Sequence, residues 1–125
     1  LAILDQAFEK SPIGFSLIDR NYCYIRINPV MAKLVSKTVD DLLGKSLKDR
    51  GPEITEKVIP YVEKVFETGE TFMYIPFRMT LKDSNIVSGM VSYYPIRHPM
   101  TNEIFAVAIS FQDITKQLKT QTLLK

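Results

Sequence analysis

The chain has 125 residues, of which 46% are hydrophobic and 24% charged, and its formal net charge is +2. These values are ordinary for one folded domain and exclude an intrinsically disordered chain. The small charge gives no reason to expect nucleic acid as a partner, and no apolar run approaches the roughly 20 residues of a membrane-spanning helix. A single cysteine, Cys23, excludes an internal disulfide framework. Because the chain starts without methionine, we expect it to be part of a longer protein.

The first thirty residues predict a helix followed by a β-hairpin. Residues 1–10 have helical periodicity, and the following Ser-Pro pair ends that helix because the residue before proline avoids the α region. Residues 14–19 predict a strand, Arg20-Asn21 a tight turn with a left-handed asparagine, and residues 22–28 a second strand. Strict alternation in the second strand predicts two faces. One carries Cys23, Ile25 and Ile27, and the other carries Tyr22, Tyr24, Arg26 and Asn28.

The middle of the chain predicts helices. Pro29 suits the first turn of a helix whose N-cap is Asn28. Residues 40–44 predict one more helical turn with a glycine at its end. A longer helix is expected over residues 53–68, where Pro60 should kink or split it and Gly69 should end it.

Three strands are expected in the last part of the chain, over residues 72–79, 87–96 and 104–112, before a polar helix-forming tail from residue 115 to 125. In the first of these strands, alternation places Met73 on the same face as Ile75 and Phe77. Two strands, then helices, then three strands indicate an α+β fold, with an antiparallel sheet covered on one face by the middle helices.

Residues with catalytic potential are few and scattered. The only histidine, His98, falls in a polar turn, and Cys23 is expected to be a small core side chain. Asp40 and Asp41 are neighbours on a helix and point in different directions, so a helix N-terminus explains them better than an acid–base pair. We therefore expect no catalytic residue, no metal site and no enzymatic activity in this chain.

Five methionines, seven phenylalanines and six tyrosines leave two interpretations open. They can be ordinary core packing, or they can line an adaptable pocket between helices and sheet, because methionine repacks readily around a guest. Periodicity alone places such a pocket among nine side chains: Met31, Leu34, Leu42, Val58, Val62, Ile75, Phe77, Met90 and Phe111.

Four stretches of the sequence share the form of one known family. Residues 17–29 have the form of a hairpin that ends in Asn-Pro, and residues 40–47 read DDLLGKSL. Residues 65–70 read VFETGE, and YPI at residues 94–96 is followed by FQDIT at residues 111–115. In this order, across about residues 11–115, they resemble the PAS domain, a sensory module of signalling proteins, and its PAS_4 subtype is the most similar.

The resemblance implies a PAS fold with a five-stranded antiparallel sheet in the order 2-1-5-4-3 and helices that enclose a small cavity on one face. It implies an N-terminal flanking helix (1–10), a PAS sensor domain (11–115) and the start of a C-terminal signalling helix (116–125). A ligand in the cavity would bias the sheet and, through the last strand, that helix. The same resemblance implies that Asp113, Ile114 and Thr115 couple the sheet to the C-terminal signalling helix.

Three cofactors of known PAS domains are disfavoured by departures from the family pattern. The region of the flavin-binding Asn-Cys-Arg motif reads LGKS at residues 43–46, without the cysteine. Residues 53–68 hold no histidine for haem, and the chain has no tryptophan, which FAD-binding members usually carry. We therefore expect a small organic ligand or none, rather than haem, flavin or a covalent chromophore.

The leading hypothesis is a sensory module of a cytoplasmic bacterial signalling protein. We expect a homodimer that controls a C-terminal output domain, either an enzyme of cyclic di-GMP (a diguanylate cyclase or phosphodiesterase) or a histidine kinase of a two-component system. The alternatives are a ligand-free dimerisation scaffold and a small stand-alone enzyme of the cone-shaped α+β kind. The missing catalytic residues count against the last. Neither nucleic-acid binding nor membrane insertion is expected of this segment.

Overall fold

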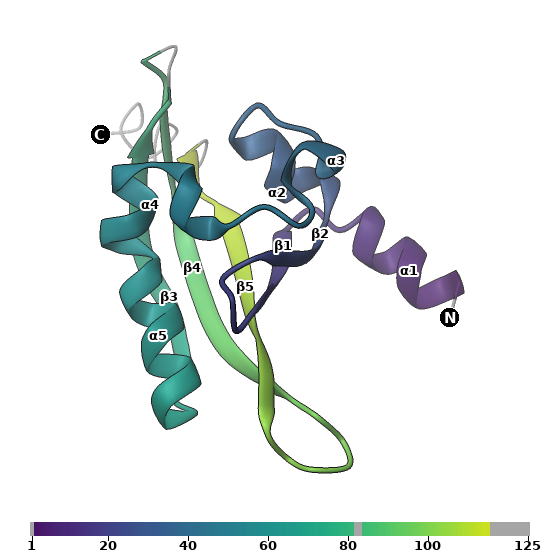
Figure 1. Cartoon of the computed structure of the whole chain (residues 1–125). Coiled ribbons are helices and arrows are strands. Elements are labelled where there is room, and N and C mark those ends of the chain that lie inside the picture. The colour runs from purple at the N-terminus through teal and green to yellow at the C-terminus, as the bar shows by residue number, and fades with distance from the viewer. Residues whose placement is uncertain (1, 82–83, 116–125) are drawn as a thin grey trace.

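Five strands form one antiparallel sheet in the order β2-β1-β5-β4-β3, which confirms the expected topology. The structure, a computed structural model, describes residues 2–81 and 84–115. The strands are β1 (Gly14–Asp19), β2 (Tyr24–Ile27), β3 (Phe72–Thr80), β4 (Ile86–Arg97) and β5 (Ile104–Asp113). The long β4 and β5 extend past the helices as a hairpin (Figure 1).

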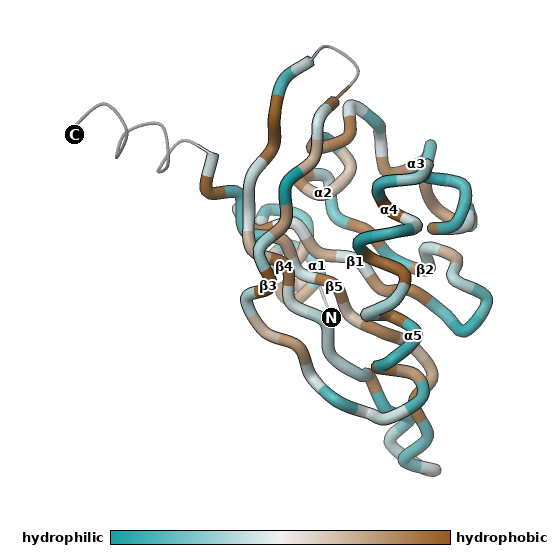
Figure 2. The backbone as a smooth tube through the Cα atoms, turned by 90° about the vertical axis from the view of Figure 1, so that its left-hand side faces the viewer, coloured by the Kyte–Doolittle hydropathy of each residue, from teal (hydrophilic) through white to brown (hydrophobic). Residues whose placement is uncertain are grey.

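The connecting helices cover one face of this sheet (Figures 1 and 2). They are α2 (Pro29–Leu34), α3 (Val39–Leu42), the 3-10 helix η1 (Leu47–Arg50), α4 (Pro52–Lys57) and α5 (Ile59–Thr68). The first helix, α1 (Ala2–Glu9), projects away from the sheet and buries none of its residues. No helix within residues 2–81 and 84–115 is both long and apolar enough to cross a bilayer.

Asn28 fixes the start of α2 and ties three elements together. Its side chain is fully buried, and its Oδ1 accepts hydrogen bonds from the N–H groups of Met31 (3.0 Å) and Phe15 (3.0 Å). Its Nδ2 donates to the carbonyls of Ile13 (2.9 Å) and Phe8 (3.3 Å). The predicted N-cap is confirmed, and because every polar atom of this amide is bonded, its burial carries no desolvation penalty for an unpaired group.

The expected long helix is split, as Pro60 predicts. A break at Val58 separates α4 from α5, and the ring of Pro60 occupies the first turn of α5, where its missing N–H costs nothing. Gly69 then ends α5 in a left-handed conformation, with φ of 74°.

The predicted alternation of the second strand is wrong, because β2 contains a bulge. Leu17 pairs with Arg26 and Ile18 pairs with Tyr24, so Ile25 has no partner of its own. One extra residue reverses the faces that precede it. Tyr24 therefore enters the core and Ile25 is 43% exposed, the opposite of the expectation.

The turn before β2 also differs from its prediction. Its left-handed residue is Tyr22, with φ of 63°, and not Asn21. Cys23 consequently lies at the entrance to β2, half-buried, and is not a core side chain.

A second bulge reverses the predicted faces at the start of β3, whereas Ile75, Phe77 and Met79 share one face as predicted. Phe72 pairs with Tyr93 and Ile75 with Val91, which leaves two residues opposite one, and Tyr74 adopts a left-handed φ of 58°. Phe72 therefore packs against the core, whereas Met73 is 49% exposed on the outer face. The predicted signalling helix over residues 116–125 lies outside the described residues.

Candidate functional site

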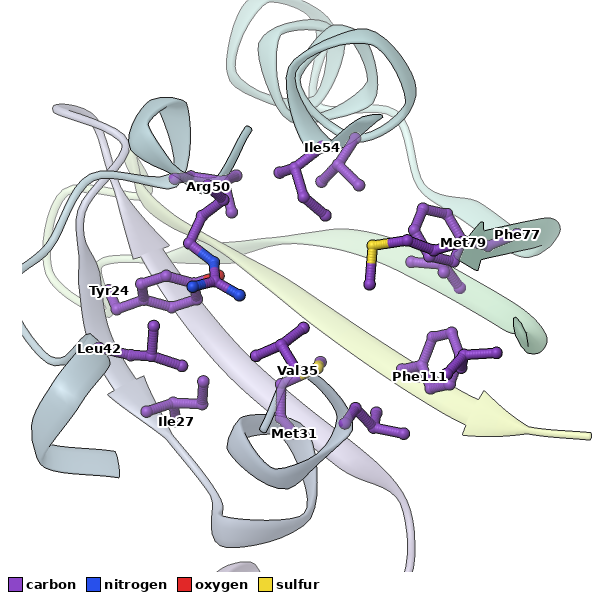
Figure 3. Close-up of a pocket in the computed structure, with 15 residues that line it drawn as sticks. Tyr24, Ile27, Met31, Val35, Leu42, Arg50, Ile54, Phe77, Met79 and Phe111 are labelled. Atoms are coloured by element: carbon purple, nitrogen blue, oxygen red, sulfur yellow. The ribbon is translucent and has the colours of Figure 1, made fainter. Parts of the chain in front are cut away.

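An apolar cavity of about 80 Å³ lies between the helices and the covered face of the sheet (Figure 3). Its walls come from β2, from α2 to α4 with η1, and from β3, β4 and β5. Among the described residues, fifteen side chains line it: Tyr24, Ile27, Met31, Leu34, Val35, Leu42, Leu47, Arg50, Ile54, Val58, Phe77, Met79, Val87, Val91 and Phe111. Only Arg50 carries a charge, and only Arg50 and Tyr24 carry polar side-chain atoms. A concave apolar site with few polar groups is the usual form of a small-molecule pocket.

Six of the nine side chains that the sequence assigned to a pocket line this cavity, and three do not. Val62 belongs to α5 and is fully buried in the core between that helix and the sheet. Ile75 and Met90 border a separate depression beside β3 and α5, together with Tyr61. Met90 is next to Val91 in β4, and Val91 lines the cavity. Because neighbouring strand residues face opposite sides of the sheet, Met90 points away from the cavity.

Sequence reasoning missed Arg50, the only charged side chain among the described residues that line the cavity. Figure 3 shows its side chain reaching from η1 toward Tyr24, with Leu42 beside them. A 3-10 helix places residues three apart on one side, so Leu47, which is 3% exposed, directs Arg50 inward as well. The three-residue spacing of Leu47 and Arg50 is the one sequence signal that could have identified Arg50. Its use requires a 3-10 turn at these residues, which the sequence did not predict.

Tyr24 lies beside the Arg50 guanidinium and remains a neutral phenol at neutral pH. Burial raises the pKa of Tyr24, and the adjacent Arg50 charge offsets part of that rise. The hydroxyl therefore keeps its proton and can donate a hydrogen bond into the cavity.

Flexible methionine side chains form part of the cavity wall. Met31 from α2 and Met79 from β3 both line it, and Figure 3 shows the Met79 thioether directed into the space that Val35 also faces. Unbranched methionine side chains can repack around guests of different shape. This wall can therefore adapt to a ligand with little movement of the backbone.

Phe111 connects the cavity to the end of the last strand. Its ring packs edge-on against Phe77 (centroids 6.0 Å apart) and crosses Gly89 of β4 so closely that a Cβ there would overlap the ring. The close approach therefore requires glycine. Ser88, the neighbour of Gly89, lies next to the end of β5.

The junction predicted to couple sheet and helix is bonded to β4. The Ile114 N–H donates to the Ser88 carbonyl (2.9 Å), and the Thr115 hydroxyl accepts from the Ser88 N–H (2.9 Å) and donates to its carbonyl (3.2 Å). The Asp113 carboxylate accepts from the Thr115 N–H (2.9 Å). Asp113 thus bonds to the first amide of the following turn, while the Thr115 hydroxyl contacts β4.

Other candidates for chemistry stay apart. His98 is exposed in the β4–β5 turn and its Nδ1 accepts from the Met100 N–H (3.1 Å). Asp41 forms a capping box with Thr38 at the start of α3, in agreement with a helix N-terminus. Over residues 2–81 and 84–115, no three histidine, cysteine or acidic side chains gather as metal ligands would.

A model of the PAS fold family matches residues 8–119. A search of curated proteins gave no match. The solved structure of a PAS domain from Colwellia psychrerythraea superposes with a TM-score of 0.73 at 22% identity, covering 91% of this chain and 98% of that one.

Two further proteins show the same fold. A structure described as VqmA bound to DPO has a TM-score of 0.76 at 15% identity over 90% of this chain and 57% of that one, and a Vibrio cholerae VqmA dimer is also similar. The Rhodobacter sphaeroides LOV protein has a TM-score of 0.68 at 14% identity, covering 90% of this chain and 66% of that one. This chain spans a little over half the length of the VqmA structures it matches. From the family match and the five-stranded sheet, the chain belongs to the PAS family.

Proposed function

We propose that this PAS domain senses a small organic ligand in the cavity and passes its occupancy to an output domain joined after the sheet. The observation that carries the proposal is the line of contacts from Phe111 across Gly89 to Ser88 and Thr115. A ligand that shifts the Phe111 ring displaces the backbone to which the Thr115 hydroxyl is bonded. The energy that a ligand can transmit this way equals its differential affinity for the two arrangements of the junction.

The output domain is proposed to be a diguanylate cyclase, a cyclic di-GMP phosphodiesterase or a histidine kinase in the cytoplasm. The PAS segment itself acts as a sensor without catalysis. Haem is disfavoured, because the cavity has no histidine in its walls. Flavin is disfavoured by size, since the cavity of about 80 Å³ is far smaller than the roughly 300 Å³ at the low end of drug-sized pockets.

Native mass spectrometry of the purified domain, beside its Val35→Phe variant, tests the proposal. Val35 lines the cavity, and a phenylalanine there fills it. We expect a fixed mass increment on the wild type that the variant lacks. In a separate hydrogen-exchange measurement, the exchange rate of the Ser88 amide should change when the ligand is present. A ligand that the variant retains equally well would refute the cavity as the sensing site.

A ligand-free dimerisation scaffold is the second candidate, and the exposed surface of α1 favours it. Ile3 and Leu4 are 82% and 64% exposed. Phe8, on the same helix, lines a depression on the outer face of the sheet together with Met73 and Tyr74. A second copy of the chain could cover this apolar surface.

Sedimentation of the Leu4→Glu variant tests this second candidate. A charge at Leu4 should convert a dimer to a monomer, whereas Gln6→Glu adds the same charge on the polar face of α1 and should leave the dimer intact. Dimers without any mass increment would favour the scaffold, and monomers at all concentrations would exclude it.

A further inference from the structure

The cavity holds one positive charge in an otherwise apolar wall. Arg50 is the only charged residue among its fifteen lining side chains. The Nε atom of Arg50 is shielded from solvent and has no hydrogen-bond partner among the described residues. A buried guanidinium donor without a partner costs free energy, and an acceptor that enters the cavity recovers it.

No acidic side chain of the described residues forms an ion pair with Arg50. The one ion pair that the described residues form joins Arg26 of β2 to Asp5 of α1 (2.9 Å). The carboxylate of Glu53, three residues along the chain, also has a shielded oxygen without a partner, but Glu53 does not line the cavity. Tyr24, the other polar side chain of the wall, presents a hydroxyl next to the guanidinium.

We propose that the ligand of this cavity is a short-chain monocarboxylic acid whose carboxylate pairs with the Arg50 guanidinium and whose hydrocarbon chain fills the apolar space. This inference rests on the proposed sensory function and specifies the chemical class of its ligand. The planar fork of arginine matches the two oxygens of a carboxylate. A single guanidinium neutralises a monoanion, whereas a phosphate dianion would keep an uncompensated charge in an apolar wall. The Tyr24 hydroxyl supplies a further donor to the same carboxylate.

The volume of the cavity limits the length of the acid. At about 80 Å³ it has roughly half the ~150 Å³ of an engineered apolar cavity that binds benzene. With the carboxylate beside Arg50, it therefore suits acids of roughly three to five carbons, with Met31 and Met79 adjusting to branched chains.

The surroundings of Arg50 set the orientation of the acid. Val35, Arg50, Ile54 and Met79 line both the cavity and a polar depression on the outside of the protein, where Lys37 and Asp49 also lie. Arg50 thus stands between solvent and the apolar interior. The acid binds with its carboxylate at this boundary and its chain pointing inward, toward Phe111 and the strand that leads to the junction.

Isothermal titration calorimetry with isovalerate and its neutral isostere isovaleramide, on the whole 125-residue chain, tests the inference. The acid should bind roughly ten- to a hundredfold more tightly than the amide, the usual range for a hydrogen bond to a charged group. Arg50→Met should abolish this preference while the amide still binds, and Arg50→Lys should restore part of it.

Two control variants separate the cavity charge from its neighbours. Lys37→Met removes a positive charge from the outer depression alone, and Glu53→Gln removes the nearby carboxylate. Both should retain the preference for the acid. Loss of the preference in Lys37→Met would overturn the inference, because it would place the anion outside the cavity.

The remaining outcomes distinguish the ligand class from the sensory function. Equal binding of acid and amide, blocked in both cases by Val35→Phe, would refute the monocarboxylate and leave a cavity that senses neutral ligands. If neither probe nor any other small acid of this size binds, the monocarboxylate is refuted. If apolar ligands of every other class also fail to bind, the proposed sensory function fails with it.

Discussion

The two halves of the covered face of the sheet differ in how completely they are filled. In the half covered by α5, Val62 and Val65 of that helix are fully buried. Tyr61 of α5 stacks on the buried Tyr93 of β4, with ring centroids 4.9 Å apart. Beneath α2 and α4, methionines, leucines and Arg50 surround the cavity. The break at Val58 separates the two halves. One sheet can thus combine a rigid support with an adaptable chamber, because each half rests on a separate helix.

The largest expected difference between the halves comes from truncating one side chain in each. Tyr93→Ala should lower the free energy of unfolding by roughly 3–5 kcal/mol, as for other buried aromatic side chains. Met79→Ala should cost no more than about 2 kcal/mol, the low end for methionine, because Met79 is partly exposed and already borders free space. Urea denaturation of both variants measures the difference. Equal losses would show that the two halves are packed alike.

Enlarging a side chain in each half gives a second contrast. Val65→Phe inserts a ring where no space exists and should cost roughly 1–3 kcal/mol or more through overpacking. Val35→Phe directs the same added volume into the cavity and should cost less than about 1 kcal/mol. Thermal unfolding of this matched pair decides the point, and a variant at Val35 that is as unstable as the one at Val65 would contradict the described cavity.

Removing the Thr115 hydroxyl tests whether the cavity half of the sheet is coupled to the junction at the end of β5, where Thr115 bonds to Ser88. Thr115→Val loses the two hydrogen bonds to Ser88, which should cost about 1 kcal/mol. The Ser88 amide should then exchange faster with solvent and cease to respond to a cavity ligand. Thr71→Val, at an exposed site before β3, serves as the control. An unchanged Ser88 amide in the Thr115 variant would remove the proposed route of coupling.

Acid pH should loosen α3, in the cavity half, and this is the smallest effect. Hydrogen bonds from the backbone and then the side chain of Thr38 hold the pKa of Asp41 below its ordinary value of 3.8. Because the folded pKa is the lower one, this stabilisation of α3 is complete above pH 3.8 and is lost as the pH falls through the folded pKa. Amide exchange should quicken in α3 before α5, and Asp41→Asn should abolish this dependence on pH.

The sequence predicted those features that depend on local chemistry. Asn28 and Pro29 located the start of α2, Pro60 located the division of the long helix, and Gly69 its end. Each signal acts within one turn of helix, so neighbouring residues suffice to read it. The strand order came from the family resemblance, since local signals do not specify which strands become neighbours.

Features that depend on a partner strand escaped prediction. Ile25 and Met73 were both expected to face the core, and a bulge before or beside each of them reversed the faces. Met90 was assigned to the pocket although no bulge interrupts β4 beside it; its neighbour Val91 lines the cavity, so Met90 faces the other side of the sheet. Arg50 was missed for a different reason. A charged residue after a short turn is usually solvated, and only the packing of Leu47 and Tyr24 directs it inward.

The buried amide of Asn28 gives the domain a natural spectroscopic reporter. One of its two hydrogens is held by the Phe8 carbonyl at the end of α1, and the other by the Ile13 carbonyl at the entrance to β1. The two hydrogens should therefore give separate resonances that exchange with water at different rates. Release of α1 would free the first hydrogen and leave the second protected. The position of the N-terminal helix could then be followed from a single side chain, with no probe attached.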